Sequence, residues 1–283
     1  MISCNLKGGL GNQLFQIFAT VAYALEYKQR FAFIYTENSP SVISPRSVYW
    51  NTFLKSLIHF TFKNLNMDGA TTIREQGFQY NTLSYPFAMD DQTEKKVVLD
   101  GYFQSYKYFE KFFSQILRLI QFEERKRECI EKYGFNVRDC ISMHFRLGDY
   151  KHVSHFHPIM SLDYYKNSLG HILEIRPSLN KVVYFCEAED NSTVQEMIQH
   201  MKTDFPRVEF EKAPDTMADW EQLIMMSSCH SNIIANSSFS WFGAYFNMNP
   251  AKVVCYPSRW FCGSGENINV SDLFPTYHDW KKI

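Results

Sequence analysis

The chain has 283 residues, with 29 basic against 30 acidic side chains. This length allows one large or two medium domains, each with its own core. The balanced charge excludes a strongly basic nucleic-acid-binding surface and an acidic tail. Aromatic residues reach 17%, which suits an aromatic core or a surface that stacks on sugars and bases, so small molecules are the expected partners.

The cysteines and the apolar N-terminal stretch indicate where the protein works. The seven cysteines form no CxxC pair, which is typical of buried thiols in a reducing compartment and not of a zinc site or a disulfide framework. The apolar stretch 14–25 is interrupted by Gln16 and Thr20, so neither a signal peptide nor a membrane span is expected. We therefore expect a cytoplasmic protein without an integral membrane segment.

The first 34 residues predict a compact β-loop-α-β unit. Its parts are a strand at 2–5, a glycine-rich loop at 7–12, a helix at 13–27 with apolar residues on one face, and a strand at 31–34. Gly8, Gly9 and Gly11 allow a bound group to approach the backbone closely, beside the free N–H groups of the helix start. The spacing fits neither GxGxxG nor a Walker loop, so a tight turn that needs glycine remains an equal alternative.

The middle of the chain is less regular. Prolines mark loops in the weakly patterned stretch 36–84, where 50–62 predicts a short helix. A strand follows at 97–100, then a helix from about residue 108 and a long amphipathic helix at 116–133. We place a domain boundary in 134–138, which gives an N-terminal domain, 1–136, and a C-terminal domain, 137–283.

The second half alternates strands and helices clearly. Strands are predicted at 140–145, 182–186, 208–210, 232–235 and 253–256, and helices at about 161–175, 190–203, 219–228 and 239–246. This alternation predicts a parallel, doubly wound α/β sheet. Two such halves facing each other would leave a cleft into which both sets of strand ends open.

A charged heptad ends the first of these strands. The residues from His144 to Tyr150 read HFRLGDY and follow the apolar run 140–143. Ligands of an open α/β sheet bind at this edge. The forked, permanently charged guanidinium of Arg146 suits a phosphate or diphosphate. The alternative is that Arg146 and Asp149 form an ion pair that closes a turn, and the heptad alone leaves both readings open.

A second candidate site lies between the strand at 232–235 and the next helix. Asn236, Ser237 and Ser238 occupy this junction, and one of the two serines should cap the helix beside its unpaired N–H groups. Such a helix start can bind a diphosphate without a metal. An ordinary helix cap is the alternative. The diphosphate interpretation gains weight because Arg146 is expected at a strand end of the same sheet.

Five segments carry a resemblance to a known family. Together they resemble the α-1,2-fucosyltransferases of glycosyltransferase family eleven, with motifs in the same order over almost the whole chain. They are GGLGNQLFQ at 8–16, GYFQSYKYF at 101–109, HFRLGDY at 144–150, the run DWEQLIMMSSCHSNIIANSSFSWFGAYF at 219–246, and YPSRWF at 256–261.

The resemblance implies a fold, a reaction and a set of ligands. The fold would be GT-B-like, with two Rossmann-like domains facing across a cleft. The enzyme would move L-fucose from GDP-fucose to an acceptor glycan, expected at the 2-hydroxyl of a galactose-type residue, with inversion and without a metal or another cofactor. A catalytically inactive sugar-binding or GDP-binding protein on the same fold is the alternative. The place of action would be the cytoplasm, with peripheral attachment to a membrane that carries lipid-linked glycans.

The resemblance also assigns residues. His144 and Arg146 match the donor-site His-x-Arg, with Arg146 on the β-phosphate. The segment expected around guanosine and diphosphate is matched by Asp219 and the 236–238 loop. Gly8 to Asn12 match the N-terminal loop that faces donor sugar and acceptor, and Gly9, Gly11 and Asn12 are its expected binding residues. This chain departs from the family motif at one position, where Leu147 replaces a second arginine.

An inverting transfer can also use a base that accepts the proton of the acceptor hydroxyl. The resemblance makes 1–136 the acceptor-side domain and 137–283 the GDP-fucose-binding domain. Asp149, Glu187 and Asp219 are the candidates, since each is predicted at a strand end or in an adjoining loop of the GDP-fucose-binding domain. Asp149 is preferred, with orientation of Arg146 as its alternative role. Glu187 is also counted among the residues that contact the donor.

Overall fold

The computed structural model describes residues 1–41, 45–88, 95–134, 139–277 and 279–283. The chain forms two compact units. Unit 1 contains 1–125 and 269–275, and unit 2 contains 126–268 and 276–283. The boundary expected at 134–138 falls largely outside the described residues. The two units divide between Arg125 and Lys126, so the described residues 126–134 of the predicted N-terminal domain belong to unit 2, and the segment 269–275 of the predicted C-terminal domain belongs to unit 1.

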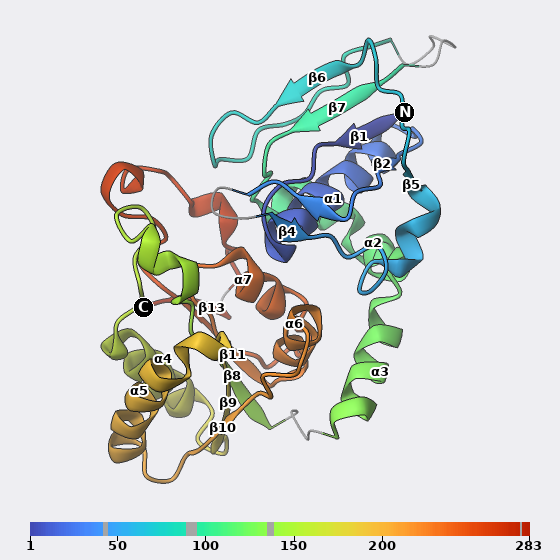
Figure 1. Cartoon of the computed structure of the whole chain (residues 1–283). Helices are drawn as coiled ribbons and strands as arrows, with labels where there is room; N and C mark the ends of the chain where they lie inside the picture. The colour runs from blue at the N-terminus through green and yellow to red at the C-terminus, as the bar shows by residue number, and fades with distance from the viewer. Residues whose placement is uncertain (42–44, 89–94, 135–138, 278) are drawn as a thin grey trace. The chain divides into compact units, whose positions relative to one another are not determined.

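Unit 2 is built on a parallel sheet (Figure 1). Among the described residues it has six strands in the order β10-β9-β8-β11-β12-β13, and every neighbouring pair is parallel. This confirms the predicted parallel α/β sheet, and only β13 was not predicted. The strands are β8 (Cys140–His144), β9 (Lys181–Phe185), β10 (Glu209–Lys212), β11 (Ser231–Ile233), β12 (Val254–Tyr256) and β13 (Trp280–Lys282).

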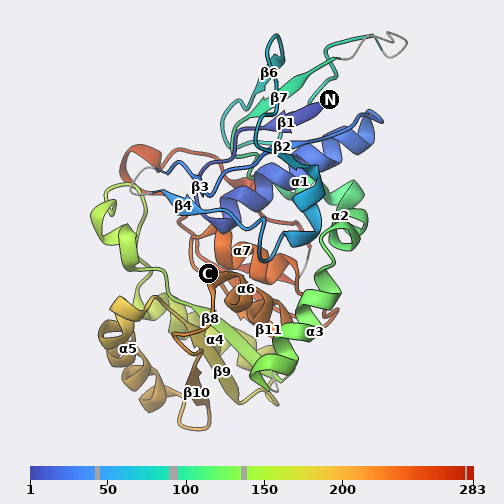
Figure 2. The ribbon, with the colours of Figure 1, turned by 45° about the vertical axis from the view of Figure 1, so that its right-hand side comes forward.

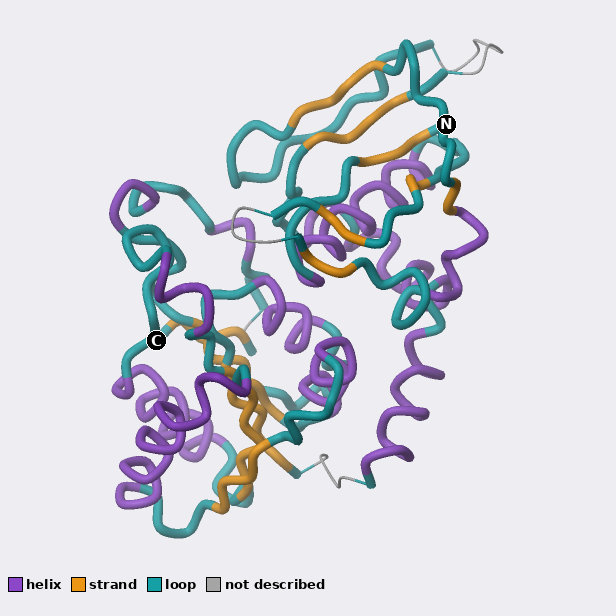
Figure 3. Tube along the Cα trace, viewed as in Figure 1, coloured by secondary structure: helices purple, strands orange, loops and turns teal. Residues whose placement is uncertain are grey.

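Helices cover both faces of this sheet (Figures 1 and 3). On one side lie α4 (Leu162–Ile175) and α5 (Asn191–Asp204), and on the other lie α6 (Asp219–Ser228) and α7 (Ser238–Tyr245). All four begin and end within one or two residues of the predicted bounds.

Strand β8 divides its side chains between the two faces. Ile141 and Met143 belong to a buried apolar cluster with residues of α4 and α5. Ser142 instead accepts a hydrogen bond from Asn232, whose amide also reaches a carbonyl of α6, and His144 lies against Phe239 of α7 with ring centroids 5.4 Å apart. The two-residue period of a strand thus sends the polar side chains of β8 to the α6 and α7 side.

Unit 1 has a smaller parallel sheet in the order β1-β7-β6. Its strands are β1 (Ile2–Cys4), β7 (Val97–Asp100) and β6 (Thr71–Arg74), and helix α1 (Leu10–Glu26) lies along it (Figure 2). Two short pairs complete the unit, β2 (Phe33–Ile34) with β5 (Thr61–Phe62), and β3 (Asn38–Ser39) with β4 (Arg46–Ser47). The β3–β4 pair is antiparallel, and the prediction of an α/β fold with a parallel sheet is confirmed for the main sheet of each unit.

Three helix predictions in the first 134 residues need correction. Helix α1 begins at Leu10, three residues before the predicted start, so Gly11 lies in its first turn. The short helix expected at 50–62 is a 3₁₀ helix at Lys55–Phe60 that runs into β5. The helix expected at 116–133 is interrupted between α2 (Phe113–Leu119) and α3 (Phe122–Tyr133), because Gln121 adopts a φ of 54° that a right-handed helix cannot continue.

The segment 269–275 is fixed to unit 1 by hydrogen bonds. The hydroxyl of Ser105 donates to the backbone carbonyl of Asp272 at 2.6 Å, and the backbone N–H of Tyr80 donates to the Asp272 carboxylate at 3.0 Å. Asp272 also forms an ion pair with Lys107. Across the described residues, none of the helices combines the length and the apolar character needed to cross a membrane. All seven cysteines are free thiols, as predicted.

Candidate active site

Arg146 lies two residues beyond the end of β8 and is largely buried, with 17% of its side chain exposed. Its guanidinium forms ion pairs with Asp149 and with Glu187, which follows the neighbouring strand β9. The ring of Tyr150 lies 4.9 Å from the guanidinium carbon. The Arg146–Asp149 ion pair of the alternative interpretation is thus present, and it leaves the phosphate interpretation open because the fork carries five N–H donors.

A buried aspartate holds the turn that carries these residues. Asp190 is fully buried and accepts a hydrogen bond from the backbone N–H of Gly148 at 2.7 Å, while Lys151 forms an ion pair with it. Gly148 has a φ of 25°, and a Cβ there would lie 2.5 Å from a carboxylate oxygen of Glu187. The turn therefore favours glycine for its backbone conformation, and the Glu187 carboxylate lies close against it.

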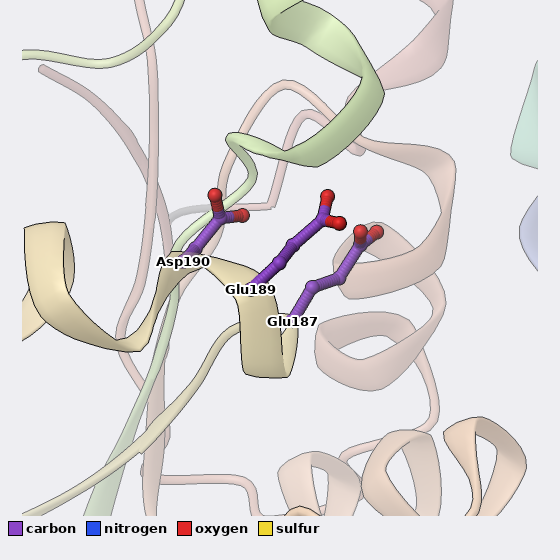
Figure 4. A group of neighbouring side chains, drawn as sticks. All are labelled: Glu187, Glu189 and Asp190. Carbon is purple, nitrogen blue, oxygen red and sulfur yellow. The ribbon is translucent and has the colours of Figure 1, made fainter.

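The same region contains a group of three carboxylates. Oxygen atoms of Glu187, Glu189 and Asp190 lie within 4.8 Å of one another, and all three side chains extend from one short helical segment (Figure 4). Such a group has donors that a hard cation accepts. Asp190 already has Lys151 and the backbone N–H of Gly148 as partners. The expectation that the reaction needs no metal stays a prediction.

The second candidate site forms the start of α7. Ser237 is the helix N-cap, and its hydroxyl accepts a hydrogen bond from the backbone N–H of Phe239 at 3.3 Å. This confirms the predicted serine cap. Because β8 and β11 are adjacent and parallel, Arg146 and the 236–238 loop follow the same ends of neighbouring strands. Tyr150 connects the two sites, since its hydroxyl donates to the carbonyl of Asn236 at 3.0 Å.

Asn236 and His144 are buried side chains at these strand ends. The Asn236 amide donates to the carbonyls of Pro158 at 2.9 Å and Trp260 at 3.1 Å, so it fixes two loops. Within the described structure, Asn236 Oδ1 and His144 Nδ1 are buried without a hydrogen-bond partner. Burial, helped by the charge of Arg146, lowers the pKa of His144 to about 3, so the imidazole is neutral at ordinary pH. Unpaired buried polar atoms are costly, and a bound ligand could satisfy these two.

Two other residues occupy positions that the sequence left open. Asp219 is the first residue of α6, where it is exposed and accepts a hydrogen bond from the backbone N–H of Trp220 at 2.7 Å. It lies at a helix start and not at a strand end. Leu147 is 5% exposed and belongs to the apolar cluster under α4 and α5. The side chain at this position therefore packs in the core, away from the face that carries His144.

The glycine-rich loop belongs to unit 1. Gly8 has a φ of 81°, and a Cβ there would lie 2.5 Å from the amide nitrogen of Asn12. Asn12 Oδ1 accepts a hydrogen bond from Gln104 at 2.8 Å. A Cβ at Gly9 would meet no atom within 4 Å, while Gly11 is buried in α1. Gly8 thus fits the interpretation of a tight turn that needs glycine. Gly9 has open space beside it, as the alternative of a close approach by a bound group requires.

Sequence reasoning missed the roles of two residues. Tyr150 was within the HFRLGDY motif, but its contact with the guanidinium of Arg146 was not foreseen. Asp190 gave one usable signal, because it follows a predicted strand end together with Glu187 and Glu189. That spacing indicates an acidic cluster at the sheet edge, although it does not reveal which carboxylate is buried.

Comparison with known proteins identifies the family. The model described as "Glycosyl transferase family 11" matches residues 1–259. The chain belongs to glycosyl transferase family 11. This confirms the resemblance seen in the motifs, and this family 11 chain is a glycosyltransferase.

Three curated relatives of this family 11 chain are bacterial or animal glycosyltransferases. The O-antigen biosynthesis glycosyltransferase WbnK of Escherichia coli is 26% identical over 94% of this chain and 97% of its own length. The alpha-1,2-colitosyltransferase of Escherichia coli is 23% identical over 100% of this chain and 99% of its own. The galactoside 2-alpha-L-fucosyltransferase of Caenorhabditis elegans is 24% identical over 89% of this chain and 71% of its own.

Solved structures with a similar chain path include two glycosyltransferases. A glycosyl transferase family 9 protein from Veillonella parvula has a TM-score of 0.47 at 11% identity, covering 100% of this chain and 86% of its own. POFUT1 in complex with GDP-fucose has a TM-score of 0.46 at 11% identity, covering 90% of this chain and 97% of its own.

Proposed function

We propose that this family 11 enzyme transfers L-fucose from GDP-fucose to the 2-hydroxyl of a galactose-type residue in an acceptor glycan, with inversion and an α-1,2 linkage. Two relatives support the linkage and the sugar class, since one is named an alpha-1,2-colitosyltransferase and one a galactoside 2-alpha-L-fucosyltransferase. The observation that carries the proposal is the buried guanidinium of Arg146 at the carboxyl edge of β8, beside the strand that leads into α7.

The departing diphosphate needs positive charge as the sugar leaves it. Arg146 supplies a forked cation that can donate two parallel hydrogen bonds to phosphate oxygens. The start of α7 supplies backbone N–H groups and the positive end of its dipole. Both groups lie at neighbouring strand ends and are positioned before the reaction begins. Such preorganised donors stabilise the charge that develops on the leaving group.

The acceptor hydroxyl must attack from the face opposite the diphosphate and lose its proton. Asp149 remains the proposed base, because its carboxylate lies in the turn that leaves β8. Its ion pair with Arg146 gives it a second possible task, the orientation of the guanidinium. Variant kinetics separate these tasks, because a base affects the rate constant and an orienting group affects diphosphate binding.

Colitosyl transfer is a second candidate, because the colitosyltransferase matches the whole of this chain. The test is an acceptor-array assay in which GDP-fucose and GDP-colitose are offered separately and products are read by mass spectrometry. Our proposal predicts a product that is heavier by one fucosyl residue and a fixed α-1,2 linkage. Transfer from GDP-colitose alone would mean that the donor sugar is colitose and not fucose. GDP binding without any transfer would support the alternative, a catalytically inactive GDP-binding protein.

The acceptor and the place of action follow from the same proposal. The relative named for O-antigen biosynthesis supports an acceptor that belongs to a bacterial-type surface glycan. Cytoplasmic action on glycans held at a membrane surface, with peripheral attachment of the enzyme, agrees with this reading. Sedimentation of the pure protein with vesicles that carry lipid-linked glycan would test the attachment.

A further inference from the structure

The charges around Arg146 oppose the ligand that this residue is proposed to bind. Four carboxylates lie in this cluster, those of Asp149, Glu187, Glu189 and Asp190, against the two cations Arg146 and Lys151. The formal charge of the cluster is therefore −2, from four negative and two positive groups. A diphosphate that approaches this cluster meets net repulsion as long as all four carboxylates stay in place.

The two arms of the guanidinium are both occupied. Nη2 holds Asp149 and Nη1 holds Glu187. A phosphate that binds the remaining N–H groups of the fork shares the guanidinium charge with both carboxylates and is repelled by them, so withdrawal of one carboxylate strengthens phosphate binding.

Glu187 is the carboxylate best able to withdraw. Its side chain is 44% exposed, whereas that of Asp149 is 18% exposed and that of Asp190 is fully buried. Asp149 lies in the same turn as Arg146, three residues along the chain, while Glu187 reaches the guanidinium from the end of β9. A half-exposed ion pair of this kind contributes about 1 kcal/mol or less to stability, so solvent can replace Arg146 as the partner of the Glu187 carboxylate at small cost.

We propose that Glu187 is an internal competitor of the donor diphosphate, which occupies Arg146 in the free enzyme, swings into solvent when the diphosphate binds, and returns when the nucleoside diphosphate leaves. This rests on the part of the proposed function that places the diphosphate on Arg146. Glu187 thereby sets donor affinity and favours product release. It is a positioning residue for Arg146 and neither a ligand of the donor nor the base.

The test uses Glu187→Gln, which keeps the size of the side chain and removes its charge. Calorimetry with GDP, and separately with inorganic pyrophosphate, should show binding about fivefold tighter than in the unmodified enzyme, the effect of losing one half-exposed ion pair. Glu189→Gln is the matched control, because it removes the same charge two residues away from a side chain that has no ion pair with Arg146 among the described residues. It should change affinity by about twofold or less.

Steady-state kinetics separate the proposed competition from a purely structural role of Glu187, because a structural role would not lower KM while leaving kcat unchanged. Glu187→Gln should lower KM for GDP-fucose by a similar factor of about five, with no rise in kcat, because the gain lies in binding. In an Arg146→Ala background, the gain in GDP affinity from Glu187→Gln should fall to the twofold or less expected of Glu189→Gln, because only the repulsion between the charges remains once the guanidinium is gone.

The outcomes separate this inference from the proposed function. Weaker binding of GDP and pyrophosphate by Glu187→Gln, or the same change as in Glu189→Gln, would overturn the inference while fucosyl transfer by the unmodified enzyme stands. Glu187→Gln could also bind pyrophosphate more tightly in a protein that does not use GDP-fucose. That result would support competition at Arg146 and would overturn GDP-fucose as the donor. Loss of folding is checked by thermal unfolding of each variant before the affinities are compared.

Discussion

Arg146 is the residue on which the diphosphate proposal depends. Replacing it by alanine removes the fork and leaves Asp149 and Glu187 without their cation. We expect GDP binding to weaken by about 2–5 kcal/mol, the range for truncation of one partner in a buried charge pair. Calorimetry on the folded variant measures this loss.

Arg146→Lys is the control for charge alone. Lysine keeps the positive charge but presents a point charge in place of a planar fork. Its GDP affinity should fall between those of the unmodified enzyme and Arg146→Ala. Unchanged GDP affinity in a correctly folded Arg146→Ala protein would remove Arg146 from the donor site.

Asp149 can be assigned a role by a single isosteric change. Asp149→Asn keeps size and hydrogen bonding and removes the basic carboxylate. As the base, Asp149 should reveal itself by a ~10²–10⁴-fold fall in kcat with GDP affinity nearly intact. Stopped assays with GDP-fucose and calorimetry with GDP supply the two numbers. A parallel loss of GDP affinity would instead make it the group that orients Arg146.

We predict that the reaction does not depend on a metal ion, and a cluster of three carboxylates makes this prediction worth testing. Glu187, Glu189 and Asp190 lie close enough to share a cation. Arg146 and the start of α7 already provide positive charge for the diphosphate, so we expect fucosyl transfer to continue in excess EDTA. Activity that disappears on chelation and returns with magnesium or manganese would contradict this expectation.

Replacing either of two helical glycines near the site by alanine should change the stability of the protein, in opposite directions. Gly170 lies in α4 where an added Cβ would meet no atom within 4 Å, so Gly170→Ala should stabilise the protein by about 0.5–1 kcal/mol through helix propensity. Gly243 lies in α7 where a Cβ would come within 2.8 Å of the Met226 Cβ in α6. Gly243→Ala should destabilise by about 1–3 kcal/mol because α6 and α7 must move apart.

Urea denaturation followed by circular dichroism measures both variants. The pair controls for composition, since each change adds the same methyl group to a helix. Gly243→Ala should also weaken GDP binding if the position of the α7 start matters for the diphosphate. Equal stability of the two variants would mean that the α6–α7 contact is looser than the structure shows.

The stability of the whole molecule should depend on acid through His144. Its pKa is lowered from the ordinary 6.5 to about 3 in the folded protein. Below pH 6.5 the unfolded chain therefore binds a proton that the folded protein does not, and unfolding becomes easier as pH falls from 6.5 towards 3. The loss should approach about 1.4 kcal/mol for each pH unit in that window.

The measurement is the free energy of unfolding in urea between pH 7 and pH 5. This range lies above the titration of the carboxylates with lowered pKa, which are Asp215, Glu221 and Asp272. Burial also lowers the pKa of His157 and His230, which add in the same direction, whereas burial raises the pKa of Glu75, which acts in the opposite direction. His144→Gln keeps a neutral polar side chain and should flatten the dependence. An identical slope in this variant would show that His144 is not the group responsible.

Local patterns in the sequence were sufficient for the architecture of unit 2. The alternation of strand and helix periods predicted its parallel sheet, and the junctions placed Arg146 and Ser237 at strand ends because turn and cap chemistry act within a few residues. In unit 1 the same reasoning was weaker, since the break at Gln121 follows from one backbone angle that no pattern of apolar residues encodes.

The sequence by itself determined that this protein is an α/β glycosyltransferase of family 11 with a cationic strand end. Only the tertiary structure decided the partners of that cation. Glu187 meets Arg146 from 41 positions along the chain, and Asp190 reaches the Gly148 amide from 42 positions away. It also decided that 269–275 joins unit 1. Such contacts depend on how separate strands are brought together in a sheet, and local spacing carries no record of that pairing.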